Sequence, residues 1–224
     1  MDWKRLSYFF HTPQMLIDSL LNQYPGELRV VVPSQATDLA AYLSSTPAKI
    51  QHIHSIYIQG QAATDGKGYL LPDNASYNLR EDMEAAHFLF SFQDQVPFIL
   101  LGKYAAYPMA YTREEMIQTT QKLHKAGDYI QKAAEMGLAC FLQRDSATFY
   151  RVFGIPDSIL AKEALQAIDK ISNPYDLLTV IAMDRPELFH ITETGKHKLI
   201  GMHPGESYFR DSVKLKKLLL MECE

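Results

Sequence analysis

Three short apolar segments separated by helical patterns constrain the fold of this chain more than any other feature. They lie at residues 28–32, 55–58 and 97–101. Strands that are almost continuously apolar, with helices between them, are typical of a parallel sheet that is covered on both faces. The sequence therefore predicts an α/β fold with three layers, in which a mostly parallel open sheet is flanked by helices.

Helix boundaries support this order of elements. Thr12 and Pro13 have the pattern of a helix start, with threonine as N-cap and proline in the first turn, and Pro25-Gly26 ends that helix. A second helix is predicted to begin near Thr37 and a third to cover residues 83–92.

Residues 112–171 are predicted to be mainly helical. Thr112 and Glu115 have the spacing of a capping box at the start of this region, and we expect a break in the helical pattern at Gly137. The chain is long enough to bury one continuous core, so we treat residues 1–224 as a single domain.

Composition and charge exclude several classes of protein. The net charge is −4 and the longest basic run is at residues 214–217, so the chain lacks the basic stripe typical of nucleic-acid binding. The apolar runs are shorter than the roughly 20 residues of a membrane span. We therefore expect neither nucleic acid nor a membrane as a partner. Cys140 and Cys223 cannot form a disulfide framework and no secretory pattern follows Met1, which favours a cytoplasmic location.

Ligands of parallel α/β sheets bind beyond the carboxyl ends of the strands. That rule places residues 34–37, residues 59–61 and the loop after Leu101 at one rim. The segment 61–76 is rich in Gly, Asp and Pro and is predicted to be a surface loop near the mouth of a ligand site.

Several segments follow one another in an order that chance would rarely produce. They are residues 25–32, 35–40, 53–61, 77–86 and 173–177, followed by residues 186–189. The run Tyr77-Asn78-Leu79-Arg80-Glu81-Asp82-Met83-Glu84-Ala85-Ala86 resembles the Phe-Asn-x-x-x-Asp-Pro-Glu-Ala-Ala signature of the inosine/uridine-preferring nucleoside hydrolase family. Tyr175-Asp176 resembles the His-Asp motif of the same family. The resemblance implies that family's fold and its activity, which is cleavage of the N-glycosidic bond of ribonucleosides.

One part of the family pattern is absent. The family opens with a strand that ends in an Asp-rich motif, Asp-x-Asp-x-x-x-Asp-Asp, which holds a calcium ion, and nothing of this kind precedes Thr12. The resemblance therefore implies a truncated homologue. Such a chain lacks the first strands of the fold and the base that activates the attacking water.

By resemblance, two calcium ligands remain, the backbone carbonyl of Thr37 and the carboxylate of Asp176. A calcium ion takes about 6 to 8 oxygen ligands, so one carbonyl and one carboxylate should leave the site empty or very weak. We thus expect no cofactor, with residual Ca²⁺ binding as the alternative. Asp176 could equally cap the helix that follows it.

The resemblance assigns Asn78 and Ser76 to the substrate site. Asn78 matches an asparagine that holds the ribose hydroxyls, and Ser76 stands where the family has glutamate, although Asn78 could instead be a turn residue. Tyr175 stands where the family has the histidine that helps the base to leave. Tyrosine, with an ordinary pKa near ~10, is a poorer proton donor at neutral pH. No residue is therefore assigned as catalytic, and whether the chain is an enzyme stays open.

Three functions are consistent with these residues. In the favoured one, a nucleoside hydrolase-like domain without metal-dependent activity of its own binds a nucleoside or ribose-like small molecule, or acts as an interaction protein. In the second, the chain is the carboxyl-terminal part of a split or oligomeric nucleoside hydrolase. In the third, Asp38, Tyr175 and Asp176 catalyse a different reaction.

Without the first strands of the family fold, the strand at residues 28–32 should lie at an open sheet edge. Bare apolar edges promote aggregation and are normally covered or paired. We therefore predict that residues 1–11 fold over this edge, or that a homodimer or a partner chain pairs there.

Overall fold

The computed structural model describes residues 12–74, 76–123 and 125–221. The chain divides into two compact units. The first, here called the sheet unit, comprises Met1–Ala106 and Tyr175–Asp211, and the second, the helical unit, comprises Tyr107–Pro174 and Ser212–Glu224. The helices of the second unit pack mainly on one another. The single domain expected for residues 1–224 stays a prediction.

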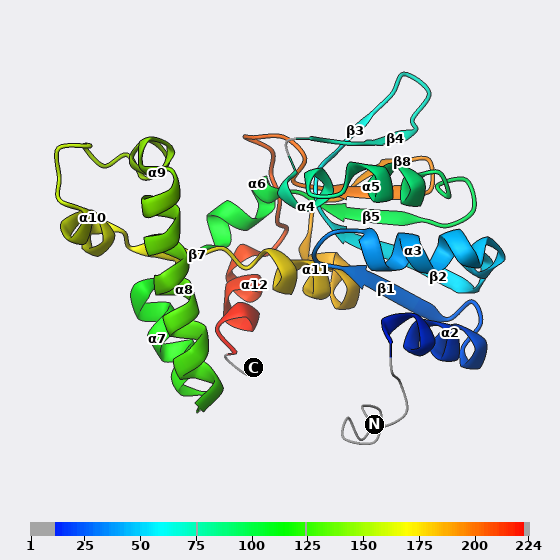
Figure 1. Ribbon diagram of the computed structural model, residues 1–224, viewed down its shortest axis with the longest axis horizontal. Coiled ribbons are helices and arrows are strands. Elements are labelled where there is room, and N and C mark those ends of the chain that lie inside the picture. Colours follow the sequence, from blue (N-terminus) through cyan, green and yellow to red (C-terminus); the bar gives the residue numbers. More distant parts are fainter. Residues whose placement is uncertain (1–11, 75, 124, 222–224) are drawn as a thin grey trace. The chain divides into compact units, whose positions relative to one another are not determined.

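A five-stranded sheet forms the centre of the sheet unit (Figure 1). Its strands, in spatial order, are β1 (Leu28–Val32), β2 (Ile53–Gln59), β5 (Phe98–Leu101), β9 (His197–Ile200) and β8 (Thr192–Thr194). The first four are parallel, and β8 runs antiparallel to β9. The predicted α/β class with a mostly parallel sheet is confirmed.

Helices cover both faces of this sheet. On one face, α2 (Pro13–Gln23), α3 (Thr37–Ser45) and α5 (Met83–Phe90) share an apolar core with alternate strand residues such as Ile56 and Leu100. Residues of the opposite parity, such as Tyr57 and Ile99, are also buried, and α11 (Tyr175–Asp184) packs against their strands. Because successive side chains of a strand point to opposite faces, α11 covers the second face. The predicted three layers are therefore present.

The remaining elements of the sheet unit are short. They are η1 (Pro47–His52), β3 (Ala62–Thr64), β4 (Leu70–Pro72), α4 (Tyr77–Arg80), α6 (Lys103–Ala106) and η3 (Pro186–Leu188). The loop predicted at 61–76 instead contains an antiparallel hairpin of β3 and β4. Leu70 anchors the hairpin, since its side chain is buried in the core of the sheet unit.

Strand β1 lies at one edge of the sheet and, among the described strands, pairs with β2 alone. Val30 and Val31 are only half-buried there. An open edge beside residues 28–32 was expected. Residues 1–11, which were predicted to cover it, lie outside the described residues.

The helical unit is built around aromatic side chains. Its elements are η2 (Tyr107–Met109), β6 (Tyr111–Thr112), α7 (Arg113–Gln121), α8 (Lys125–Arg144), α9 (Ser146–Phe153), α10 (Ala161–Ala167), β7 (Lys170–Ser172) and α12 (Ser212–Leu219). Phe149 is fully buried, with ring centroids 5.4 Å from Phe141 and 4.8 Å from Phe153. This cluster joins α8 to α9, so the unit has an apolar core of its own.

The capping box at Thr112 and Glu115 is confirmed, because each side chain bonds to the other residue's backbone N–H. The break predicted at Gly137 is wrong. Helix α8 runs through Gly137, and the helical pattern is instead interrupted at Lys122 and Leu123, after the end of α7. A glycine inside a helix costs about 1 kcal/mol relative to alanine, and the packing of Phe141 one turn further on outweighs that cost.

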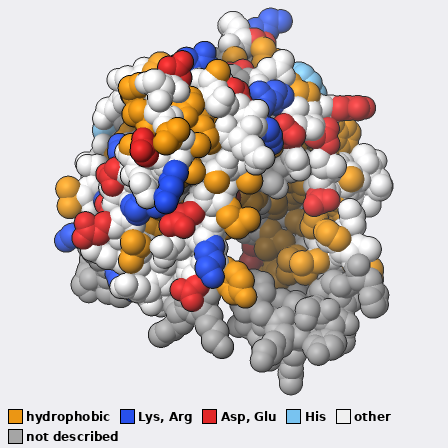
Figure 2. All heavy atoms as spheres, turned by 60° about the vertical axis from the view of Figure 1, so that its left-hand side comes forward, with side chains coloured by type: hydrophobic (Ala, Val, Ile, Leu, Met, Phe, Trp, Pro, Cys, Tyr) orange, Lys and Arg blue, Asp and Glu red, His pale blue; other side chains and the backbone are white. Residues whose placement is uncertain are grey.

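The surface carries charges of both signs. In the view of Figure 2, Lys and Arg side chains are interspersed with Asp and Glu side chains, and hydrophobic side chains lie between them. Within the described residues, no helix combines the length and the apolar composition needed to cross a membrane.

Candidate functional site

Strands β1, β2, β5 and β9 are parallel and adjacent, so their carboxyl ends meet at one edge of the sheet, here called the rim. The backbone is tightly packed at this edge. A Cβ on Gly102, which follows β5, would lie 2.3 Å from the carbonyl oxygen of Gly201, which follows β9. Glycine is therefore required where the chain leaves these two neighbouring strands. The strand ends that the sequence predicted to form one rim do lie next to one another.

Asn78 fastens the rim ends of two strands. Its Nδ2 donates to the carbonyl oxygen of Pro33 at 2.8 Å, to the carbonyl oxygen of Gln59 at 3.2 Å and to Gln59 Oε1 at 2.5 Å. Pro33 follows β1 and Gln59 ends β2. The amide nitrogen is thus occupied within the protein, and a contact from Asn78 to a ligand would use Oδ1, which can only accept hydrogen bonds.

Ser76 lies directly beside the end of β2. Its side chain is buried, and a Cβ on Gly60 would lie 3.0 Å from Ser76 Oγ. The structure therefore brings Ser76 and Asn78 to the same strand end, as the resemblance implied. Their roles in binding a substrate stay predictions.

Thr37 and Asp82 link two helix starts at the rim. Thr37 Oγ1 donates to Asp82 Oδ2 at 2.5 Å, and Asp82 Oδ1 accepts from the backbone N–H of Ala85 at 3.0 Å as the N-cap of α5. The hydrogen bond from Thr37, and then that from Ala85, hold the pKa of the Asp82 carboxyl below its ordinary value. We had assigned no role to Asp82, although it lies within the matched segment 77–86.

Tyr175 and Asp176 begin α11, and the direction of this helix places them on the rim side. Arg29 Nη1, near the start of β1, donates to the carbonyl oxygen of Met183, near the end of α11, at 3.1 Å. The helix thus ends near the amino end of β1, and its 10 residues carry its start about 15 Å toward the carboxyl ends. Desolvation raises the pKa of the Asp176 carboxyl.

Gln61 spans the rim above β5. Its Nε2 donates to the carbonyl oxygen of Met202 at 2.8 Å, so the side chain runs from the end of β2 to the end of β9. Gln61 is buried, and among the described residues its Oε1 has no hydrogen-bond partner. The sequence places Gln61 at the rim, with residues 59–61, but assigns it no role, because a polar residue after a strand looks like an ordinary turn residue.

The two expected calcium ligands do not make a metal site by themselves. Thr37 offers a carbonyl and Asp176 a carboxylate, whereas Ca²⁺ takes about 6 to 8 oxygens. In the part of the chain that the structure describes, no three or more His, Cys, Asp or Glu side chains are grouped so that they could hold a metal ion. These residues therefore do not fit a calcium ion.

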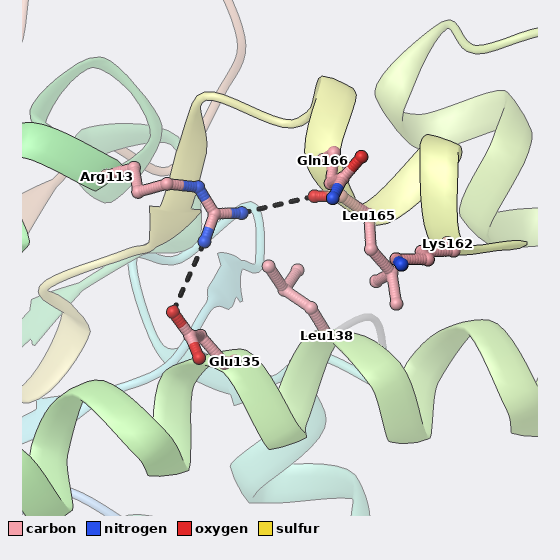
Figure 3. Close-up of a pocket in the computed structure, with 6 residues that line it drawn as sticks. All are labelled: Arg113, Glu135, Leu138, Lys162, Leu165 and Gln166. Atoms are coloured by element: carbon pink, nitrogen blue, oxygen red, sulfur yellow. Dashed lines mark hydrogen bonds and ion pairs between the residues drawn. The ribbon is translucent and has the colours of Figure 1, made fainter.

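A separate cavity lies within the helical unit (Figure 3). It has a volume of about 440 Å³ and is lined by Arg113, Glu135, Leu138, Lys162, Leu165 and Gln166. These residues come from α7, α8 and α10. No pattern in the sequence predicted that they would meet.

Comparisons with known proteins identify the fold. No protein-family model and no curated protein matches the sequence. A crystal structure of the type III effector protein XopQ complexed with adenosine diphosphate ribose is 26% identical, with a TM-score of 0.72, over 92% of this chain and 62% of that chain. The chain therefore spans less than two thirds of the length of this neighbour.

Two nucleoside hydrolases are similar in fold at lower identity. The purine-preferring ribonucleoside hydrolase from Gardnerella vaginalis is 14% identical, with a TM-score of 0.63, over 95% of this chain and 65% of that chain. The plant nucleoside hydrolase PpNRh1 is 18% identical, with a TM-score of 0.58, over 93% and 65%. The fold is thus nucleoside hydrolase-like.

Proposed function

We propose that this chain is a nucleoside hydrolase-like domain that binds a ribose-containing small molecule at the rim of its sheet, without metal-dependent hydrolysis of its own. The shortage of free oxygen ligands at the rim carries this proposal, since Thr37 and Asp176 offer a divalent cation only one carbonyl and one carboxylate, and the carboxylate of Asp82 already accepts from Thr37 Oγ1 and from the backbone N–H of Ala85. The resemblance of the segments around Asn78 and Asp176 supports it, as does the fold shared with a solved protein that is complexed with ADP-ribose.

The rim residues have defined roles under this proposal. Asp176 accepts hydrogen bonds from ribose hydroxyls, and the free Oε1 of Gln61 is a further acceptor. Asn78 and the Thr37–Asp82 pair hold the strand ends and helix starts around the ligand. Because no glycosidic bond is cleaved under this proposal, Tyr175 does not protonate a leaving base.

Calorimetric titration with ADP-ribose and with inosine, each with and without CaCl₂, tests the proposal. We expect binding that does not depend on calcium and no release of ribose from inosine. Asp176→Ala should weaken binding about tenfold, which corresponds to the loss of one hydrogen bond to a charged group, at about 1.4 kcal/mol. Asp184→Ala, at the other end of α11, is the matched control and should not change the affinity.

Two results would overturn this function. One is release of ribose from inosine by the chain alone in the presence of calcium. The other is the absence of binding to either molecule. Equal losses of affinity in Asp176→Ala and Asp184→Ala would show that the binding site does not lie at the start of α11.

A second candidate function is that of the carboxyl-terminal part of a split or oligomeric nucleoside hydrolase. Among the described strands β1 pairs with β2 alone, and Val30 and Val31 are half-buried, which favours this function because a strand from another chain could pair there. Under this alternative, a partner that carries an Asp-rich strand should restore ribose release, and Asp176→Ala should abolish it. A mixture that remains inactive although the two chains associate would count against the split enzyme.

A further inference from the structure

The cavity between α7, α8 and α10 is built around a fixed arginine. Arg113 Nη1 lies 3.3 Å from Glu135 Oε1, and Arg113 Nη2 donates to the carbonyl oxygen of Leu165 at 3.1 Å. Arg113 is the first residue of α7, directly after the capping box that fixes the start of this helix. Figure 3 shows its guanidinium between Glu135 of α8 and the Leu165–Gln166 segment of α10. The arginine is therefore held in place before any ligand arrives.

The polar groups of the cavity are mostly hydrogen-bond donors. A guanidinium has five N–H groups, of which Arg113 directs one toward Glu135 and one toward Leu165. Lys162 adds an ammonium group, which among the described residues has neither a hydrogen bond nor an ion pair. Gln166 contributes an amide. Glu135 is the single acidic residue among the described residues of the lining, which together have a net charge of +1 and an excess of donors.

The walls and the size restrict the ligand further. Leu138 and Leu165 supply apolar surface, and in Figure 3 their side chains lie between Arg113 and Lys162. The volume of about 440 Å³ falls in the range of small-molecule sites, which is roughly 300–1,000 Å³. A ligand that fits has one anionic group for Arg113 and an apolar body for the leucines, and Lys162 adds a second positive charge to the cavity.

We propose that this cavity binds a small organic carboxylate with an apolar body, in a site that is separate from the rim. The carboxylate pairs with the N–H groups of Arg113 that Glu135 and Leu165 do not occupy, Leu138 and Leu165 contact the apolar part, and Lys162 contributes its positive charge from the far side of the leucines. Planar carboxylates match the fork of a guanidinium, which favours this anion over a spherical one.

Glu135 provides a specific test of the proposal, because its carboxylate neutralises part of the charge of Arg113. The Glu135 carboxylate therefore competes with the carboxylate of the ligand for the same guanidinium. Removal of its charge should therefore tighten the binding of an anion, whereas removal of the charge of Lys162 should weaken it. The Arg113–Glu135 pair is partly exposed, and such pairs contribute about 0–1 kcal/mol to stability, so Glu135→Gln should still fold.

The test is calorimetric titration of the full chain with benzoate and with benzamide, its uncharged analogue. We expect wild type to bind benzoate and not benzamide. Lys162→Gln should weaken the binding of benzoate about fivefold and Glu135→Gln should tighten it by a similar factor. Lys217→Gln, an exposed lysine of α12 outside the cavity lining, removes the same charge and should leave the affinity unchanged.

Three outcomes would overturn the proposal. They are no binding of benzoate at millimolar concentration, equal binding of benzamide, and equal weakening by Lys162→Gln and Lys217→Gln, which would reflect net charge alone. Circular dichroism of each variant separates a lost site from a lost fold. Binding of ADP-ribose at the rim should not respond to these variants, so this proposal can fail without the proposed function failing.

Discussion

The sheet unit and the helical unit are stabilised in different ways. In the sheet unit, β1, β2, β5 and β9 pair across long stretches of sequence, and the core is formed by residues from almost every element of the unit. In the helical unit, Phe141, Phe149 and Phe153 come from two consecutive helices. Long-range pairing places side chains from distant segments at a common rim, whereas local packing creates a cavity where neighbouring helices meet.

The polar contacts follow this division only in part. At the rim, Asn78 reaches the ends of two strands, and Gln61 reaches Met202 far along the chain. In the helical unit, Asp145 caps α9 through the backbone N–H of Thr148, whereas Glu115 of the α7 cap also accepts from Lys216 Nζ of α12 at 2.7 Å. Substitutions at the rim should therefore disturb several elements at once, and a substitution at the Asp145 cap only one.

The largest effects should come from truncating the two cores. Leu100→Ala in the sheet unit and Phe149→Ala in the helical unit each remove a fully buried side chain, which costs about 3–5 kcal/mol. We expect Leu100→Ala to speed hydrogen exchange in β2 and β5, and Phe149→Ala to speed it in α8 and α9. Hydrogen exchange followed by mass spectrometry, with peptides from both units, measures this.

The same experiment can contradict the division into a separately stabilised sheet unit and helical unit. If either substitution speeds exchange equally in the strands and in the helices, the two units unfold together and their separation has no energetic meaning. The exposed substitution Val152→Ala on α9 is the control, because a side chain that is 61% exposed should contribute little.

Asn78→Ala should give the next largest effect. It leaves the carbonyl oxygens of Pro33 and Gln59 without the amide donor and should destabilise the sheet unit by about 2 kcal/mol. Urea unfolding measures this difference. Asn74→Ala, an exposed residue just before α4, is the matched control. An unchanged midpoint for Asn78→Ala would show that Asn78 does not hold the rim together.

Much of the sheet unit could be predicted from the sequence. Residues 98–101 are apolar along their whole length and residues 28–32 are interrupted only by Arg29, so these strands were visible as runs. Strands β8 and β9 were not predicted, since Thr192–Thr194 and His197–Ile200 are short and partly polar. Their place is set by pairing with β5, which a local pattern does not contain.

Less of the helical unit and of the sites could be predicted from the sequence. Thr112 and Glu115 predicted the start of α7, but the continuity of α8 through Gly137 depends on packing around Phe141. At the rim, Asn78, Ser76, Thr37 and Asp176 were found by resemblance. Gln61 was placed at the rim but given no role, and the cavity at Arg113 was missed, because each depends on partners that only the fold brings near.

A smaller effect is expected from the cap of α7. Thr112→Ala removes one half of the capping box and should cost the helical unit about 1 kcal/mol, as seen by urea unfolding. Thr112→Ser keeps the hydroxyl and should retain most of the stability. If the two variants are equally destabilised, the loss comes from the methyl group of Thr112 and not from the hydrogen bond to Glu115.

The smallest effect, a shift in titration, compares two N-cap aspartates, one from each unit. Asp82 has its pKa lowered first by the side chain of Thr37, and Asp145 has its pKa lowered first by the backbone N–H of Thr148 in its own helix. Thr37→Val should therefore raise the pKa of Asp82 and leave that of Asp145 unchanged, as followed by NMR titration of the carboxyl carbons. If the pKa of Asp82 does not change in Thr37→Val, the hydrogen bond between Thr37 and Asp82 does not lower that pKa.

The sign of the linked stability follows from these directions. A carboxyl with a lowered pKa in the folded state stabilises the protein above its unfolded pKa, near ~3.9, and this contribution is lost as the pH falls through the folded pKa. Thr37→Val should reduce the stability of the sheet unit at neutral pH and lessen its decline in acid.

Asp176 works in the opposite sense, because its raised pKa favours the protonated form, and its contribution is lost as the pH rises through the folded pKa. Asp176→Asn should therefore reduce the loss of stability that Asp176 causes as the pH rises, whereas Thr37→Val should reduce the loss that Asp82 causes as the pH falls. These opposite directions distinguish the two carboxylates of the rim.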